Sequence, residues 1–360
     1  MSPAGAEEPA VRAARAERLL DLGRAAEARA QIAGVLATEP DNAMAQRLFV
    51  RCLLHLDDPL ALDAAKRAVV LAPANDQSHR LASLAHSKAG LDDLAVMHAR
   101  EAVRLAPHEW RAHHVLTRAL TGPNPEAAYE AGLAGIRLAP HEPAMHLVLG
   151  LAALRAGRNS QAQDAFRTVL TLDPDNATAR NNLAVVDLRA GRFGAAMDGF
   201  GSALATDPRL DLARGNIDAV SLTMLMKLRY LVVVSEFVAF QLTSNRPGAA
   251  PAVAGGLLAF WAGLTGWGWS RIPRRLRGYA FGVFRRRRRA ALYAGVVLIA
   301  ALGLVIGPLL GLVSTGTGLA LTVFAGLSVL ADLVWSWRIR SRGGSVPARV
   351  RRWPNSRYPS

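Results

Sequence analysis

The sequence contains a single cysteine, Cys52, in 360 residues. One thiol excludes an intramolecular disulfide framework and leaves too few sulfur ligands for a zinc cluster. Paired-cysteine, His-Glu-x-x-His and phosphate-cradling glycine motifs are absent, and no nucleophile, base and orienting group come together. The sequence therefore predicts no cofactor, metal or catalytic site and indicates a protein that is not an enzyme. Free cysteine is usually buried, so Cys52 is expected in the core.

Acidic residues are almost missing after residue 220, where only Glu236 and Asp332 occur. Residues 1–220 hold 24 Lys+Arg against 26 Asp+Glu, whereas residues 221–360 hold 19 against two. The net charge of +15 therefore arises in the C-terminal part, where arginine clusters alternate with apolar runs. A nucleic-acid binder would carry its basic face on a folded domain. The observed alternation favours membrane insertion and argues against a nucleic-acid partner.

A signal peptide is also missing from the N-terminus. Residues 1–11 are rich in Pro and Ala, without a basic start or an apolar run, and are predicted to be disordered. The part that follows is therefore expected to stay in the cytoplasm. Lysine is scarce as well, since only Lys66, Lys88 and Lys227 occur. Arginine in place of lysine, together with abundant alanine, is typical of a GC-rich bacterial genome.

Six prolines punctuate the N-terminal half at nearly constant spacing. They are Pro40, Pro73, Pro107, Pro140, Pro174 and Pro208, separated by 33, 34, 33, 34 and 34 residues. A similar apolar phrase precedes each of them, such as Val-Arg-Leu-Ala before the third. Proline stops a helix, and a fixed period of this length is typical of stacked helical units.

This pattern resembles the tetratricopeptide repeat over residues 12–208. The fifth and sixth repeats match best. Their Leu-Gly pair, turn glycine, small residue and aromatic residue fall on Leu149-Gly150, Gly157, Ala162 and Phe166, and then on Leu183-Ala184, Gly191, Ala196 and Phe200. The second and fourth repeats depart from the pattern at Leu56–Pro59 and Thr121–Pro125. The resemblance implies an all-α solenoid of six repeats, followed by a capping helix over residues 209–221.

The resemblance also implies a protein-binding groove lined by the first helix of each repeat. The outward-facing positions of these helices mix arginine with aliphatic residues. The partner-binding candidates are Arg80, Leu84, Arg118, Leu147, Leu151, Arg155, Asn181, Val185 and Arg189, with Gln77, Arg111 and His114 on the same face. Such a face suits a peptide or helix with acidic and apolar residues. The alternative interpretation is an ordinary solvated helix surface.

Some family members bind a C-terminal carboxylate with Lys and Asn pairs on successive helices. Asn181 and Asn182 resemble this pattern, but Leu147 and Leu151 occupy the comparable positions of the preceding repeat. The carboxylate clamp is therefore not expected in this protein.

Residues 222–337 contain four apolar segments that predict transmembrane α-helices. Ala290–Val313 is uncharged over 24 residues, and Gly318–Trp337 carries only Asp332 in 20 residues. Each can cross a hydrocarbon core of about 30 Å. Pro251–Trp269 is uncharged but holds five glycines, and Leu222–Leu242 is either a short span or an interfacial helix. The sequence does not decide between two and four transmembrane spans.

The distribution of basic residues predicts the topology. With four spans, the inner segments hold 18 Lys and Arg residues, and the outer loops hold one, Arg246. This asymmetry agrees with the positive-inside rule. A two-span arrangement keeps both ends inside equally well. We expect a multi-pass cell-membrane protein with its repeats and its basic tail, residues 338–360, in the cytoplasm.

Two features of the apolar segments bear on function. Gly303, Gly307 and Gly311 share one helix face and favour close packing against a neighbouring span or a second copy of the chain. Glu236 and Asp332 are acids inside predicted spans, a costly position that often marks function. The leading hypothesis is a membrane-anchored scaffold that binds a protein partner. The alternative is an accessory or transport subunit whose C-terminal helices carry the activity.

Overall fold

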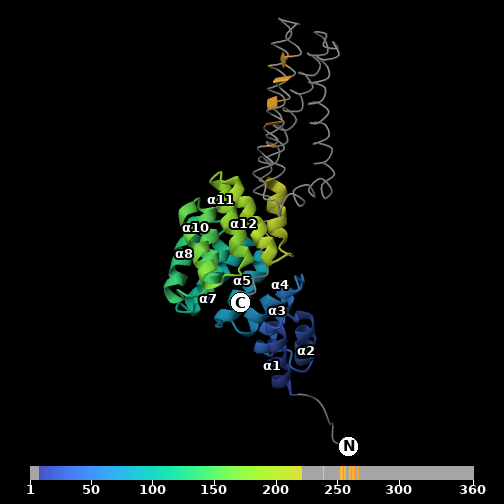
Figure 1. Ribbon diagram of the computed structural model, residues 1–360. Coiled ribbons are helices and arrows are strands. Elements are labelled where there is room, and N and C mark those ends of the chain that lie inside the picture. The colour runs from blue at the N-terminus through green and yellow to red at the C-terminus, as the bar shows by residue number, and fades with distance from the viewer. Residues whose placement is uncertain are drawn as a thin grey trace, which may run out of the picture. The chain divides into compact units, whose positions relative to one another are not determined.

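The computed structural model describes residues 8–220 and isolated positions between residues 238 and 266, and their regular structure is α-helical (Figure 1). The labelled helices are α1 (Pro9–Asp21), α2 (Ala25–Thr38), α3 (Ala43–His55), α4 (Ala61–Leu71), α5 (Asp76–Lys88), α6 (Asp92–Leu105), α7 (Trp110–Leu120), α8 (Pro125–Leu138), α9 (Pro143–Arg155), α10 (Asn159–Leu172), α11 (Ala177–Arg189) and α12 (Phe193–Thr206). Residues 211–220 are also helical, within the range expected for a capping helix. The prediction of an all-α repeat fold is confirmed.

One expected boundary differs from the structure. Residues 1–11 were predicted to be disordered, but α1 begins at Pro9. Proline is well suited to the first turn of a helix because its fixed φ is helical and its missing N–H has no partner there. The prediction was therefore wrong for residues 9–11.

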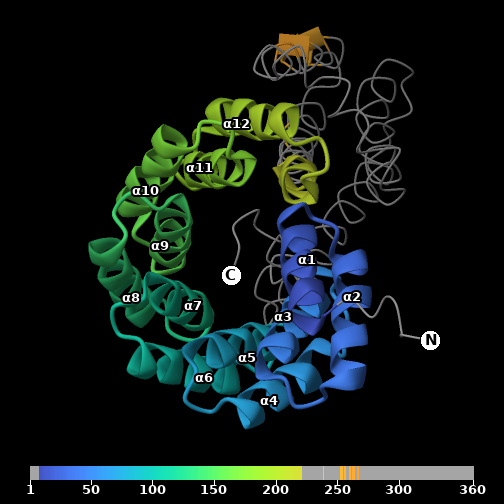
Figure 2. The same cartoon turned by 90° about the horizontal axis from the view of Figure 1, so that it is seen from below.

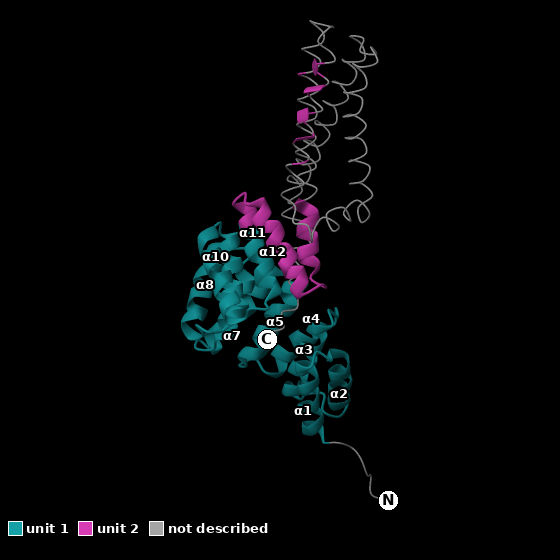
Figure 3. Cartoon of the chain, in the orientation of Figure 1, with its two compact units in different colours: residues 1–186, 352–360 teal, residues 187–351 magenta. Residues whose placement is uncertain are grey.

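Two compact units divide the chain within α11 (Figure 3). Among the described residues, the first unit ends at Val186 and the second begins at Asp187. The first unit therefore holds α1 to α10 and most of α11. The second holds the end of α11, α12 and residues 211–220.

The first unit is an array of antiparallel helix pairs. Each helix from α1 to α10 packs against the next one in the sequence, and α1, α3, α5, α7 and α9 also pack against one another in order. In Figure 2 these odd-numbered helices follow the inner side of the curve of this unit, and the even-numbered helices follow its outer side. The first helix of each pair therefore forms the inner surface.

Small residues let the two helices of a pair approach closely. Gly150 on α9 lies against the ring of Phe166 on α10, which is fully buried. A Cβ atom built on Gly150 would lie 2.6 Å from Phe166 Cε1. Real Cβ atoms essentially never come this close, so the contact requires glycine. This pair was among the residues on which the sequence resemblance rested.

The turns inside the pairs follow the predicted glycines and one aspartate. Gly157 and Gly191 have φ angles of 76° and 73°, which confirms their predicted role in the turn, and Gly23 and Gly90 adopt the same conformation in their repeats. In the second pair, Asp57 adopts a φ of 53° in place of glycine. The helix that follows, α4, has 11 residues, whereas α2, α6, α8 and α10 have 14 each. The unusual turn therefore delays the start of α4.

A repeated hydrogen bond closes the loop between successive pairs. The side chain six residues after each of five prolines bonds to that proline's carbonyl oxygen. The bonds run from His79 to Pro73 at 2.9 Å, from His113 to Pro107 at 2.9 Å, from His146 to Pro140 at 2.8 Å, and from Arg180 to Pro174 and Arg214 to Pro208. All five prolines are exposed, so these bonds orient the loop at the surface. His79, His113 and His146 therefore take the same role in three successive repeats.

Within the described part of the chain, no helix combines the length and apolar character needed to cross a membrane. The segments 290–313 and 318–337, the tail 338–360, and the residues Gly303, Gly307, Gly311, Glu236 and Asp332 lie outside the described residues. Single helical positions of the two earlier segments are described. Of these, Val238 is 47% exposed and Phe260 is 50% exposed.

Candidate partner-binding face

The odd-numbered helices bring the predicted partner-binding residues onto one surface of the first unit, which we call the inner face. Arg80 and Leu84 lie on α5, Arg118 on α7, Leu147, Leu151 and Arg155 on α9, and Asn181 and Val185 on α11. The packing of α5 against α7, and of α7 against α9, makes the first six of these neighbours in space. Arg189 is exposed at the end of α11 and belongs to the second unit.

Three of these residues do not face outward as predicted, because their side chains are covered. Arg80 is 9% exposed, Leu147 is 4% exposed and Asn181 is 2% exposed. Arg80 Nε donates to Asp76 Oδ2 at 2.9 Å, and Leu147 belongs to the core cluster around Phe166. Asn181 Nδ2 donates to the side-chain oxygen of Asn182 at 3.3 Å. These side chains are held by contacts within the array, so they stabilise the inner face from within.

The accessible apolar part of the inner face lies on α9 and α11. Leu151 and Val185 are half-buried, and each packs with one side against the core cluster that contains Phe166. Arg155, one turn after Leu151, is exposed. A partner side chain could therefore contact a fixed aliphatic surface beside a solvated guanidinium.

The cationic part of the inner face lies on α5 and α7. Arg111, His114 and Arg118 share one face of α7, because their spacing matches the helical period. Burial lowers the pKa of Arg118 to about 10, so the guanidinium stays charged at neutral pH. Burial, with Arg118, Arg80 and Arg111 close by, lowers the pKa of His114 to about 3. The imidazole is therefore neutral and surrounded by cations.

Two carboxylates and one aromatic ring complete this cluster. Asp76 pairs with Arg80, and Glu109 Oε1 lies 3.3 Å from Arg111 Nη1. The Arg111 guanidinium lies 4.6 Å from the centroid of the Trp110 ring, a cation–π contact. Arg80 and Arg111 are thus each paired with a carboxylate.

The sequence analysis missed two further arginines, on α3. Arg47 Nε donates to Gln77 Oε1 at 3.3 Å, and burial lowers the pKa of Arg47. Arg51 is 6% exposed, its Nη1 pairs with Glu17 at 3.2 Å, and its buried Nε has no hydrogen-bond partner. These residues stand 33 positions before Arg80 and Leu84. The repeat period was therefore the signal that could have identified them.

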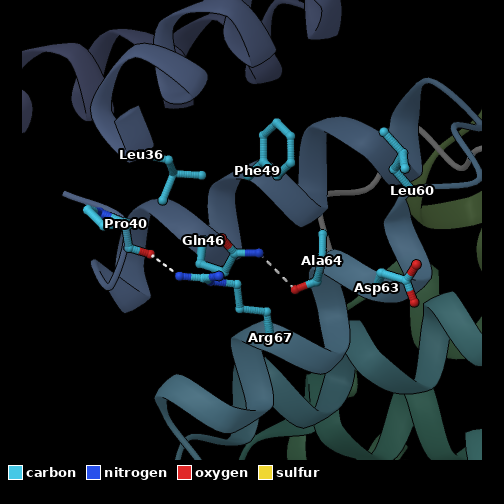
Figure 4. A pocket seen from close by; sticks show the side chains of 8 residues that line it. All are labelled: Leu36, Pro40, Gln46, Phe49, Leu60, Asp63, Ala64 and Arg67. Carbon is cyan, nitrogen blue, oxygen red and sulfur yellow. Dashed lines mark hydrogen bonds between the residues drawn. The ribbon is translucent and has the colours of Figure 1, made fainter. Parts of the chain in front are cut away.

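A separate hollow of about 420 Å³ lies among α2, α3 and α4 (Figure 4). Its apolar wall consists of Leu36, Phe49 and Leu60, and its polar residues are held by internal bonds. Gln46 Nε2 donates to the Ala64 carbonyl at 2.9 Å, and Arg67 donates to the Pro40 carbonyl at 3.0 Å. The late start of α4 leaves this space open. None of the predicted partner-binding residues lines it.

No set of three or more His, Cys, Asp or Glu side chains among the described residues is arranged to hold a metal ion. Cys52 is fully buried, and burial raises the pKa of its thiol to about 11. The inner face offers guanidiniums, a neutral imidazole and aliphatic side chains, which support noncovalent binding.

Residues 147–213 match the family model of the tetratricopeptide repeat. The chain carries tetratricopeptide repeats. The match covers the fifth and sixth repeats, the two that agree best with the sequence pattern. A comparison with curated proteins finds no match.

Many solved structures are similar to this chain, and two of them show the extent of the likeness. The first is the Cut9–Hcn1 hetero-tetramer of the APC/C, with a TM-score of 0.52 and 18% identity; the match covers 57% of this chain and 41% of that one. The second is the human IFIT1 dimer with PPP-AAAA, with a TM-score of 0.53 and 16% identity; the match covers 83% of this chain and 73% of that one. At these identities the likeness shows a shared helical-repeat fold. This fold supports a protein-interaction scaffold.

Proposed function

We propose that this protein is a membrane-anchored adaptor that binds a segment of another protein on the inner face of its repeats. The observation that supports this most directly is the inner face itself. Half-buried Leu151 and Val185 adjoin exposed Arg155, on helices that pack into one array. A rigid helical face with aliphatic contacts and nearby charges suits noncovalent recognition of an extended or helical segment.

The charge of the inner face indicates the chemistry of the partner. The cationic part on α5 and α7 contains Arg111 and Arg118, whereas the part on α9 and α11 is aliphatic. We therefore propose a partner segment with acidic residues toward α5 and α7 and apolar residues toward α9. Acidic side chains would pair with guanidiniums, which offer several donors in a planar arrangement.

The proposed membrane anchor rests on the four apolar segments and on the distribution of basic residues around them. Eighteen basic residues on one side against one on the other favours a cytoplasmic location for the repeats and the tail. The exposed helical positions Val238 and Phe260 suit an apolar surrounding. Gly303, Gly307 and Gly311 would pack against a neighbouring span or against a second copy of the chain.

The first test is affinity purification in mild detergent, with the full chain beside residues 1–220 and identification of bound proteins by mass spectrometry. Recovery of the same partner by both would support the inner face as the binding part. In the full chain, Arg111→Glu should reduce recovery about tenfold, because it places a carboxylate on α7, where the acidic part of the segment would bind. Arg167→Glu, at an exposed position of α10, is the matched control. Equal recovery by the two variants would argue against the inner face.

Recovery by the full chain alone would instead favour the C-terminal segments as the active part. Acids within predicted spans, Glu236 and Asp332, are the observation behind this second candidate, an accessory or transport subunit. In that case Glu236→Gln should abolish activity of the complex while the partner stays bound.

A further inference from the structure

Three histidines meet between α5 and α6 in the third repeat. His79 Nδ1 lies 3.1 Å from His98 Nδ1, and the centroids of these two rings are 5.3 Å apart. The ring centroid of His86 lies 5.0 Å from that of His98. His79 is 7% exposed, His86 is 3% exposed, and His98 is half-buried. The three imidazoles therefore form one largely buried cluster, which we call the histidine latch.

The hydrogen bonds fix the tautomers of the latch in its neutral form. His79 Nε2 lies 2.9 Å from the Pro73 carbonyl oxygen, which only accepts, so this nitrogen carries the proton. His79 Nδ1 is then an acceptor, and His98 Nδ1 must donate to it. His86 Nδ1 lies 2.8 Å from the Ala82 carbonyl oxygen and donates in the same way. One chain of bonds thus joins α6, α5 and the loop that precedes α5.

Protonation of His98 is disfavoured where this ring lies between α5 and α6. Its Nδ1 already donates to His79, so an added proton would go to Nε2. The resulting cation would lie beside the buried rings of His79 and His86, which solvate the charged form poorly. Protonation of His98 therefore opposes the packing of α6 against α5.

We propose that the histidine latch is an acid-sensitive device that holds the third repeat closed while His98 is neutral and loosens α6 from α5 when His98 takes up a proton. Because His79 also bonds to the Pro73 carbonyl, separation of α6 from α5 would also weaken the loop between the second and third repeats. Because α5 also carries Arg80 and Leu84, the same event would alter the inner face. The device itself does not depend on the proposed adaptor function.

The groups that act on His98 agree with this assignment. They are His79 and His86 from α5 and Glu101 from α6 itself. Burial, assisted by the two histidines, lowers the pKa of His98 to about 4, and Glu101 opposes this shift. Glu101 Oε1 is itself held by Arg104 Nη2 at 2.6 Å, so its charge is partly neutralised. The net effect disfavours the protonated ring in the folded state.

The histidine latch of the third repeat has no described counterpart in the fifth. In the fifth repeat His146 makes the corresponding bond to Pro140, but the bonds described for it do not continue to a histidine on α10. The helices α9 and α10 therefore provide an internal control with the same architecture.

Hydrogen exchange of the full chain, followed by mass spectrometry at pH 7 and pH 4.5, tests the proposal. After correction for intrinsic exchange rates, amides of α5 and α6 should lose about tenfold or more of their protection in acid relative to those of α9 and α10, as a displacement of one or more pKa units implies. An equal response of the two helix pairs would overturn the proposal.

Two variants separate protonation from packing. His98→Gln keeps an N–H donor for His79 but does not titrate, so α5 and α6 should keep their protection at pH 4.5. His98→Phe keeps a ring of similar shape and should likewise lose the acid response, even if its protection at pH 7 is lower. A normal acid response in either folded variant would contradict the proposal. His146→Gln should leave the response of α5 and α6 unchanged.

Discussion

His146 Nε2 donates a hydrogen bond to the carbonyl oxygen of Pro140 at 2.8 Å, across the junction between the fourth and fifth repeats. The same bond recurs from His79 to Pro73 and from His113 to Pro107. Each proline follows the end of one helix, and each histidine lies in the first turn of the next. The junction is thus closed by a bond that stays within seven consecutive residues.

The first prediction concerns this junction. His146→Ala should lower the free energy of unfolding by about 1 kcal/mol, because the Pro140 carbonyl loses its partner. His141→Ala, at an exposed position of the same loop, should change it by less than about 0.5 kcal/mol. Urea unfolding followed by circular dichroism measures both. Equal effects would show that the bond contributes nothing to stability.

The second prediction concerns the contact between Gly150 and Phe166. Gly150→Ala should destabilise the chain by about 1–3 kcal/mol, because its Cβ would lie 2.6 Å from a ring carbon that has no room to move. Gly194→Ala meets no atom within 4 Å and should stabilise α12 by up to about 1 kcal/mol through helix propensity. Thermal unfolding distinguishes the two variants, because the first should lower the melting temperature and the second should raise it. A stable Gly150→Ala variant would mean that α9 and α10 can move apart.

The third prediction concerns Cys52, the only thiol of the chain. Because burial raises its pKa to about 11, the thiolate is scarce at pH 8 and a disulfide reagent should label it slowly. Addition of urea up to the unfolding midpoint should accelerate labelling by at least about a hundredfold. Rapid labelling of the folded chain would place Cys52 at the surface.

The fourth prediction concerns pH and His114. Its pKa is about 3 in the folded chain and 6.5 in the unfolded one, so unfolding takes up a proton between these values. The stability that this difference contributes is complete above pH 6.5 and is lost as pH falls toward 3. The loss is on the order of a few kcal/mol. His114→Gln should flatten this dependence in urea unfolding at several pH values, whereas His141→Gln should not.

The repeat period predicted much of the fold, because its signals are local. Proline and glycine act on their own backbone, so Pro174 and Gly157 marked a helix end and a turn correctly. The turn at Asp57 could not be predicted in the same way. Lys88, from the following repeat, donates to the Leu54 carbonyl and pairs with Asp57. A contact between residues so far apart in sequence leaves no local pattern.

The repeat period predicted which residues lie on the inner face, but it did not predict how exposed their side chains are. The period placed Leu151 and Val185 on the surface that the structure shows. It could not reveal that Arg80 and Asn181 are covered, because burial depends on contacts with neighbouring side chains that the period does not specify. The arginines on α3 obey the same period as Arg80 and Leu84.

Five of the six repeat prolines accept a hydrogen bond from the residue six positions later, and this bears on how such a chain can change over generations. A gene segment of one period that is duplicated or lost carries its own proline, its own histidine or arginine, and the bond between them. The new junction between repeats then contains the same hydrogen bond as the existing junctions. The number of repeats, and with it the length of partner that the protein can accommodate, is therefore free to vary without redesign of the junctions.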